Sequence, residues 1–166
     1  MATQKNYILS GLAAEKKLRR MALEIIEKNA DEKQIILAGI KESGTVVAKN
    51  IQQMLKEFSN VKTELVSIKL DKRKPTEVTL SKKASFDDKV IIIIDDVVNS
   101  GQTLLYALRP FLAFHPKKIQ TLVLVERRHN SFPVRPDYVG LSVSTTLQEH
   151  IVVEVDKEKV LGAYLK

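Results

Sequence analysis

Residues 90–108, VIIIIDDVVNSGQTLLYAL, place two adjacent carboxylates in front of a small polar loop. The uninterrupted β-branched run over residues 90–94 predicts a strand buried on both faces, the pattern of a parallel sheet covered by helices. Asp95 and Asp96 follow at the carboxyl end of this strand, where their oxygens suit ribose hydroxyls or Mg²⁺. The stretch therefore has the outline of a site for a phosphorylated sugar.

The polar loop that follows is the candidate anion site. It consists of Asn99, Ser100, Gly101, Gln102 and Thr103. We expect a helix to begin in this loop, capped by Ser100 or Thr103. Its buried face would be formed by Leu104, Leu105, Leu108 and Leu112. A helix start offers free N–H groups and the positive end of its dipole to a phosphate, the hydroxyls add donors, and Gly101 allows close approach of the backbone.

The same order of strand, polar loop and helix occurs earlier in the chain. Residues 34–40 have the pattern of a strand, Lys41, Ser43 and Gly44 follow it, and apolar residues at helical spacing continue to Phe58. Because the carboxyl ends of parallel strands lie at one edge of a sheet, we expect both polar loops at the same edge, where open α/β folds bind ligands.

The remaining pattern predicts a single domain of α/β class over residues 1–166. Residues 12–28 are expected to form an amphipathic helix with a basic outer side. Further strands are expected over residues 119–125, 138–143 and 151–155. We therefore predict a largely parallel sheet of four or five strands, with helices on both faces and a small antiparallel hairpin or hood.

Residues 61–80 have a different pattern, because apolar and polar side chains alternate along them. This alternation predicts two half-exposed strands around a turn near Pro75. The turn carries Lys72 and Arg73, and such a basic hairpin could close over an anionic ligand. An equally good interpretation is a solubilising edge of the sheet.

Composition narrows the classes of function. The chain has no cysteine, which excludes disulfides and thiolate metal sites, and it has neither a basic-then-apolar leader nor a long apolar span. We therefore expect a cytoplasmic protein that has no membrane partner. The 27 basic and 20 acidic residues give a formal net charge of +7, which points to an anionic ligand, either a small phosphorylated molecule or nucleic acid.

The stretch IIIIDDVVNSGQT resembles the phosphoribosyl-pyrophosphate (PRPP) signature of the type I phosphoribosyltransferases. Two further stretches, ILAGIKESGTVVAKNI and LVLVERRHNSFPVRPDYVG, resemble the PyrR proteins, regulators of pyrimidine genes with uracil phosphoribosyltransferase activity. Arg127, His129 and Arg135 stand where that family has the same residues. Asn99 stands where the family usually has a small residue or Thr, Arg128 replaces a usual Gly, and the KES segment also departs from the family's pyrophosphate loop.

The resemblance implies the type I phosphoribosyltransferase fold and transfer of ribose 5-phosphate from PRPP to a nucleobase. The expected base is uracil, the product the nucleoside monophosphate UMP and the cofactor Mg²⁺. Separately from the resemblance, apolar residues on several helices allow a homo-oligomer, which we expect to be a dimer. Asp95 and Asp96 would hold the ribose hydroxyls and, directly or through water, the metal. The residues assigned to PRPP and its phosphates are Asn99, Ser100, Gly101, Gln102, Thr103, Lys41, Ser43, Gly44, Lys72, Arg73 and Arg127. Catalysis would come from holding opposite charges in place as pyrophosphate leaves.

Three other functions compete with this one. A PyrR-like regulator would bind RNA with little or no catalysis. Its candidate contacts are Arg19, Arg20, Arg128, His129 and Arg135. A purine phosphoribosyltransferase would use the same PRPP motif with a different base. A receiver-like magnesium domain is the weakest alternative, because no second acidic pair ends the strand at Ile40.

Overall fold

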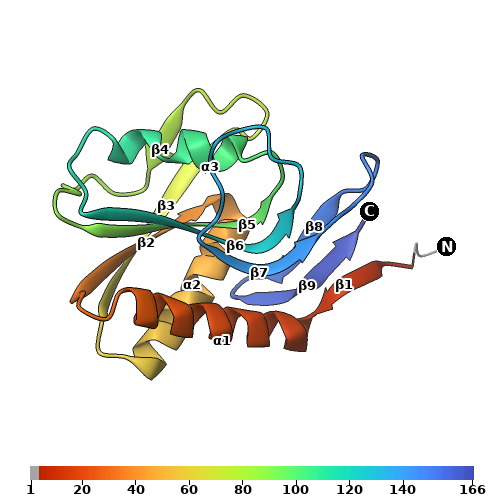
Figure 1. Ribbon diagram of the computed structural model, residues 1–166, viewed down its shortest axis with the longest axis horizontal. Helices are drawn as coiled ribbons and strands as arrows, with labels where there is room; N and C mark the ends of the chain where they lie inside the picture. The colour runs from red at the N-terminus through yellow and green to blue at the C-terminus, as the bar shows by residue number, and fades with distance from the viewer. Residues whose placement is uncertain (1–3) are drawn as a thin grey trace.

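The computed structural model describes residues 4–166 and shows an α/β fold with two sheets (Figure 1). The elements in chain order are β1 (Asn6–Ser10), α1 (Gly11–Lys28), β2 (Gln34–Ile40), α2 (Lys41–Phe58), β3 (Lys62–Leu70), β4 (Val78–Leu80), β5 (Val90–Val98), α3 (Gln102–Ala107), η1 (Arg109–Phe111), β6 (Lys118–Arg127), β7 (Tyr138–Val143), β8 (Ile151–Asp156) and β9 (Lys159–Leu165). The main sheet has the order β4-β3-β2-β5-β6-β7. Its neighbouring strands are parallel except β3 and β4, which confirms the predicted parallel sheet with an antiparallel hairpin.

Helices cover both faces of the main sheet, as predicted. Figure 1 shows α1 and α2 on one face and α3 on the other. A hydrophobic core lies on each face of the main sheet, and alternate residues of β5 contribute to each. Ile92 and Ile94 pack toward α1 and α2, whereas Ile91 and Ile93 pack on the α3 side. Among residues 4–166, no helix is both long and apolar enough to cross a bilayer.

The second sheet is not predicted by the sequence pattern. It has the order β1-β9-β8, and both of its strand pairs are antiparallel. The strand expected over residues 151–155 is present as β8, but it pairs with β9 and does not extend the main sheet. The reason is local, because a two-residue turn at Lys157 and Glu158 returns β9 directly alongside β8.

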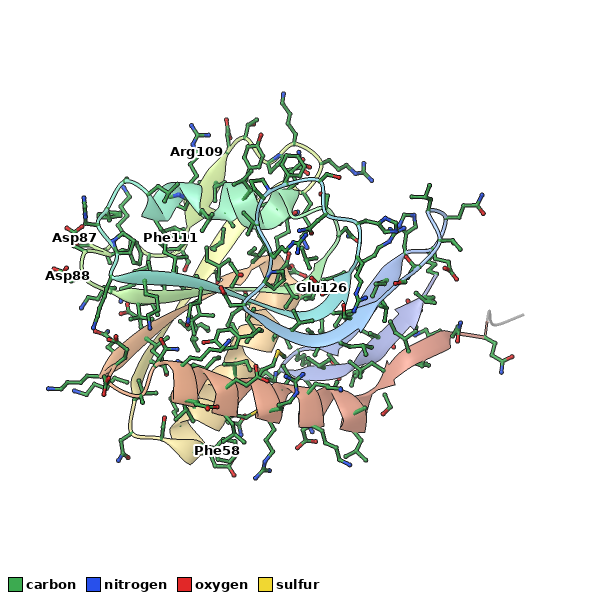
Figure 2. All side chains as sticks on the ribbon, in the orientation of Figure 1. Phe58, Asp87, Asp88, Arg109, Phe111 and Glu126 are labelled. Carbon is green, nitrogen blue, oxygen red and sulfur yellow. The ribbon has the colours of Figure 1, made fainter. Side chains whose placement is uncertain are left out.

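The helix after the polar loop is shorter than the spacing of its leucines predicts. α3 ends after six residues and a 3-10 turn over Arg109–Phe111 follows, because Pro110 has no N–H to continue an α-helix. Phe111 fills the buried position, whereas Leu112 is 65% exposed, so the buried role predicted for Leu112 is wrong. In Figure 2, Phe111 lies on the sheet side of α3 and Arg109 points away from the sheet.

A buried polar cluster joins the end of α1 to β6 and β7. Asn29 is 5% exposed, and its Nδ2 donates to the Ile25 carbonyl (2.9 Å) and to Oε1 of Gln120 (3.0 Å). Its Oδ1 accepts from Nζ of Lys118 at 3.0 Å. The Tyr138 hydroxyl donates to Oε1 of Gln120 at 2.9 Å, and burial raises the pKa of Tyr138 to about 12. The side-chain amide of Asn29 thus forms hydrogen bonds with groups of α1 and β6.

Asn29→Ala should therefore lower the free energy of unfolding by about 1–3 kcal/mol, because it leaves buried donors and acceptors without partners. Urea titration followed by circular dichroism measures this difference. Asn60→Ala, at an exposed position, is the matched control and should change stability by less than about 0.5 kcal/mol. Equal stability of the Asn29 variant and the wild type would contradict the role given to this cluster.

Candidate functional site

The acidic pair lies at the carboxyl end of β5, in the middle of the main sheet. The side chain of Asp95 is 1% exposed and that of Asp96 is 16% exposed. Because successive strand residues point to opposite faces, the two carboxylates border different cavities. Asp95 borders a cavity of 180 Å³ lined by residues 97–104, and Asp96 borders a cavity of 960 Å³ along α2.

Lys72 joins the two carboxylates. Its Nζ lies 3.2 Å from both carboxylate oxygens of Asp95 and 3.5 Å from Oδ1 of Asp96. Lys72 comes from the loop between β3 and β4, in which the Arg73 N–H donates to Oδ1 of Asp71 at 2.9 Å. The side chain of Arg73 forms no ion pair or hydrogen bond within residues 4–166. The structure therefore places Lys72, and not Arg73, at the acidic pair.

Burial sets the electrostatics of this cluster. Burial raises the pKa of the Asp95 carboxyl well above its ordinary value, the negative charge of Asp96 adds to this shift, and the Lys72 ammonium opposes it. Burial also disfavours the charged form of Lys72, but the charges of Asp95 and Asp96 outweigh burial and raise the pKa of Lys72. A nearby cation therefore offsets only part of the cost of placing two carboxylates at one strand end.

The polar loop is held between β5 and the loop that joins β6 to β7. The Ser100 carbonyl accepts hydrogen bonds from the N–H groups of Ser131 (2.9 Å) and Phe132 (3.0 Å). Gly101 has φ 89°, and an added Cβ would lie 2.8 Å from the Val134 carbonyl oxygen. A glycine is thus required here by the backbone conformation and by close packing within the chain, before any ligand is considered.

The cap of α3 differs from the prediction. Gly101 is the N-cap residue, and no side chain caps the helix, so neither Ser100 nor Thr103 has the predicted role. Oγ of Ser100 accepts only from the Gln102 N–H, at 3.3 Å. The Thr103 hydroxyl forms no hydrogen bond within residues 4–166 and borders the 180 Å³ cavity together with Asn99. Hydroxyls in this cavity are therefore free to bind an anion.

The second expected loop is absent, because α2 begins at Lys41 directly after β2. Lys41 has φ 51°, a left-handed conformation that residues other than glycine rarely adopt. Gly44 is buried, and an added Cβ would lie 2.7 Å from the Ile94 carbonyl oxygen and 3.4 Å from Oδ1 of Asp95. The first turn of α2 therefore lies against the end of β5, and Lys41 and Ser43 border the 960 Å³ cavity.

Arg127 has a partner within the fold instead of a place in either cavity. Its residue surface is 8% exposed, and Nη2 donates to the Thr146 carbonyl at 2.6 Å. Its Nε is buried without a hydrogen-bond partner among residues 4–166. This contact ties the end of β6 to the loop before β8, and Arg127 lines neither of the two cavities at the acidic pair, so the geometry gives no support to its predicted contact with PRPP or its phosphates.

Two of the candidate RNA residues contact β7, one of the two edge strands of the main sheet. Arg20 donates to two carbonyls of β7, at 2.9 and 3.0 Å, and Nε of Arg128 donates to Oγ of Ser142 at 3.1 Å. Arg19 stacks on the Phe58 ring, 4.7 Å from its centroid. The two other candidates, His129 and Arg135, are exposed on the loop between β6 and β7. Nε2 of His129 lies 3.4 Å from the carbonyl oxygen of Thr145, so four of the five residues already have partners within the chain.

The larger cavity also contains lysines that sequence reasoning did not single out. They are Lys49 of α2, Lys69 of β3 and Lys157 of the turn between β8 and β9. A signal existed for Lys49, because it follows Lys41 by eight residues, which is close to two helical turns. No comparable signal joins Lys69 and Lys157, since they lie in distant segments that meet only in the folded chain.

A family model of the phosphoribosyl transferase domain matches residues 5–158. The chain belongs to this family. This phosphoribosyltransferase is 34% identical over 163 residues to the "Bifunctional protein PyrR" of Streptococcus pneumoniae (strain CGSP14), and the alignment covers 93% of this chain and 94% of that protein. The resemblance inferred from the motifs is therefore confirmed over nearly the whole chain.

Two solved structures share the fold of this phosphoribosyltransferase. The hypoxanthine phosphoribosyltransferase of Trypanosoma cruzi has a TM-score of 0.80 and 14% identity, with 97% of this chain and 95% of that chain covered. A hypoxanthine-guanine phosphoribosyltransferase (hpt-2) of Bacillus anthracis str. 'Ames Ancestor' has a TM-score of 0.77 and 19% identity, with 97% and 98% covered. The predicted type I phosphoribosyltransferase fold is confirmed.

The burial of Asp95 predicts that its carboxylate lowers the stability of the folded chain, although the same carboxylate is a candidate for the chemistry of the site. Asp95→Asn should raise the free energy of unfolding at pH 7 by roughly 1–2 kcal/mol, because an amide oxygen still accepts from the Asp96 N–H without carrying a buried charge. Since the folded-state pKa of Asp95 is raised, the wild type is stabilised below the ordinary carboxyl value of 3.8 and loses that stability as pH rises through the raised pKa.

The difference between the two proteins should accordingly vanish near about pH 4 and grow toward neutral pH. Urea titrations across this range measure it, with the exposed Asp31→Asn as the control. An Asp95 variant that is less stable than the wild type at pH 7 would mean that the ion pair with Lys72 contributes more than burial costs.

Proposed function

We propose that this phosphoribosyltransferase transfers ribose 5-phosphate from PRPP to uracil, which yields UMP and pyrophosphate and serves pyrimidine salvage. The observation that carries the proposal is the end of β5, where two carboxylates separate a small polar cavity from a larger basic one. The resemblance to PyrR proteins supports uracil. The neighbours named for hypoxanthine are only 14% and 19% identical, so they bear on the fold and not on the base.

The sugar would lie across the acidic pair. Asp95 and Asp96 would accept hydrogen bonds from the 2- and 3-hydroxyls of the ribose and place negative charge beside the anomeric carbon, where positive charge develops. The 5-phosphate would enter the 180 Å³ cavity, which contains the hydroxyls of Ser100 and Thr103 and the amide of Gln102. Two fixed ends, the carboxylates and this loop, would orient the reacting carbon toward the incoming base.

The pyrophosphate would lie on the other side of the acidic pair. Lys41 and Ser43 border the larger cavity there, and Gly44 allows the start of α2 to approach the end of β5. Lys72 lies in the same cavity, so its ammonium can turn from the carboxylates to the leaving group. The loop that carries Lys72 would also cover the ligand and exclude water that would hydrolyse PRPP.

The donor set fits Mg²⁺ bound together with pyrophosphate. Residues 4–166 contain no group of three or more His, Cys, Asp or Glu side chains that could enclose a metal. Asp95 and Asp96 supply carboxylate oxygens, and Mg²⁺ commonly takes one or two carboxylates along with water and substrate phosphates. When bound, the ion would neutralise charge that builds on the departing pyrophosphate.

RNA binding is the second candidate function. Arg128, His129 and Arg135 beside β7, together with the net charge of +7, favour it. Arg19 and Arg20 add little, because they already stack on an aromatic ring and hold β7. RNA binding would therefore depend on a few contacts between RNA phosphates and basic side chains of the loop between β6 and β7. The affinity of such binding falls steeply as the salt concentration rises.

Turnover of PRPP with uracil, hypoxanthine, guanine, adenine and orotate, in the presence of Mg²⁺, tests the proposal. We expect UMP from uracil. Asp95→Asn and Asp96→Asn should lower kcat/KM by about one to four powers of ten, the range that lost charge stabilisation and positioning can cost. Asp31→Asn should keep the wild-type rate. Turnover of a purine base alone would reassign the substrate, and no turnover with sequence-selective RNA binding at about 0.15 M salt would favour the regulator.

Lys72→Met tests the role of the ammonium between the carboxylates. Its Nζ lies 3.2 Å from both oxygens of Asp95, so a metal ion that binds there must displace it. The variant should bind Mg²⁺ roughly tenfold more tightly while transferring more slowly, because a repelling charge is lost together with a contact to pyrophosphate. Calorimetry with Mg²⁺ measures the first effect. Lys74→Met, exposed in the same loop, is the control, and equal Mg²⁺ affinity in all three proteins would refute the role of Lys72.

A further inference from the structure

The 960 Å³ cavity continues past the acidic pair along the first turns of α2. The start of α2 and the second half of β3 line most of it, and the loop after β3, the end of β5, and β8 with the turn that follows it contribute the remaining residues. Its lysines are Lys41, Lys49, Lys69, Lys72 and Lys157. Its acidic lining residues are Glu42 and Asp96. Positive charge therefore dominates the wall, and it comes from segments that only the fold brings together.

Four of these lysines have no partner within the described chain. Lys72 pairs with the carboxylates at the end of β5. Over residues 4–166, the side chains of Lys41, Lys49, Lys69 and Lys157 form neither an ion pair nor a hydrogen bond. Like charges gathered around one cavity repel one another, which does not favour folding. A bound anion would convert this repulsion into attraction.

The backbone holds two of these lysines in an unusual conformation. Lys41 has φ 51° and Lys157 has φ 45°, and Asp88 is the third non-glycine residue with positive φ among residues 4–166. Lys157 begins the two-residue turn between β8 and β9, a position at which glycine is ordinarily favoured when φ is positive. Backbone strain is often found at functional sites, and both of these lysines border the cavity.

The dimensions of the cavity indicate the size of that ligand. A volume of 960 Å³ falls within the roughly 300–1,000 Å³ of small-molecule sites. A nucleic acid would instead need an extended surface of roughly 1,000 Å² or more. Buried residues that include Ile40, Ile68 and Leu70 form an apolar floor beneath the lysines. Lysine ammonium groups act as point charges that suit phosphate oxygens in many orientations.

We propose that this cavity binds a small oligophosphate, meaning a ligand with three or more linked phosphates. Two of its phosphates would lie beside Lys41 and Lys72, the position given above to pyrophosphate, and this part rests on the proposed function. The remaining phosphates would lie on Lys49, Lys69 and Lys157. Because the two positions overlap, such a ligand competes with PRPP and inhibits transfer.

Calorimetry with inorganic tripolyphosphate and with pyrophosphate tests the site, at about 0.15 M salt and without added metal. The wild type should bind tripolyphosphate at least about tenfold more tightly than pyrophosphate. A triple variant, Lys49→Met with Lys69→Met and Lys157→Met, should lose this preference and keep its pyrophosphate affinity within about twofold, because methionine retains the apolar stem without the charge.

The matched control changes exposed lysines of neighbouring positions outside the cavity: Lys56→Met in α2, Lys62→Met in β3 and Lys159→Met in β9. It should keep the full preference for tripolyphosphate. Equal affinity of the wild type for the two anions, or the same loss in the control variant, would overturn the site. Calorimetry needs neither PRPP nor a base. A protein that transfers ribose 5-phosphate to none of the bases, yet keeps a lysine-dependent preference for tripolyphosphate, therefore retains this site and loses only the proposed activity.

Discussion

The buried carboxylate of Asp95 is the constraint on which the site depends. Removing a carboxylate from water costs free energy unless charges and hydrogen bonds offset the loss. The Asp96 N–H donates to it at 2.9 Å, and Lys72 lies 3.2 Å from both of its oxygens. Gly44 lets the first turn of α2, with the positive end of its dipole, approach the same oxygens. The groups that allow Asp95 to be buried, Lys72, the Asp96 N–H and the first turn of α2, thus also surround the site.

Much of this site could be predicted because it is encoded within single segments. The β-branched run before Asp95 fixes β5 as a central strand, and the parallel arrangement then places Lys41 and the acidic pair at one edge of the sheet. The sequence predicts that Gly101 allows the backbone to approach a phosphate, whereas its positive φ and the nearby Val134 carbonyl require glycine independently of any phosphate. The basic turn that carries Lys72 and Arg73 is predicted to close over an anionic ligand, but sequence alone cannot choose between the two side chains or predict the contact of Lys72 with the acidic pair.

What the sequence could not predict depends on contacts between distant segments. Leucine spacing suggested that Leu112 is buried, but Pro110 ends the helical pattern and Phe111 takes that position. Arg127 was assigned to the ligand because it ends β6, whereas its side chain reaches the loop before β8. The lysines of β3 and of the β8–β9 turn have no periodic relation to α2, so only the packing of both sheets against α2 reveals that they border one cavity with Lys49.

The strand order of the second sheet affects the order in which parts of the chain fold during synthesis. β9 lies between β1 and β8, and it is the last of the described elements along the chain, whereas β1 is the first. Contacts between such distant segments form late, because a long loop must close before they contribute. The parallel strands around Asp95 can assemble earlier, but the turn that carries Lys157 is fixed only when β9 pairs. During synthesis the acidic end of the site and the lysines of α2 and β3 can therefore take shape before Lys157 completes the basic wall.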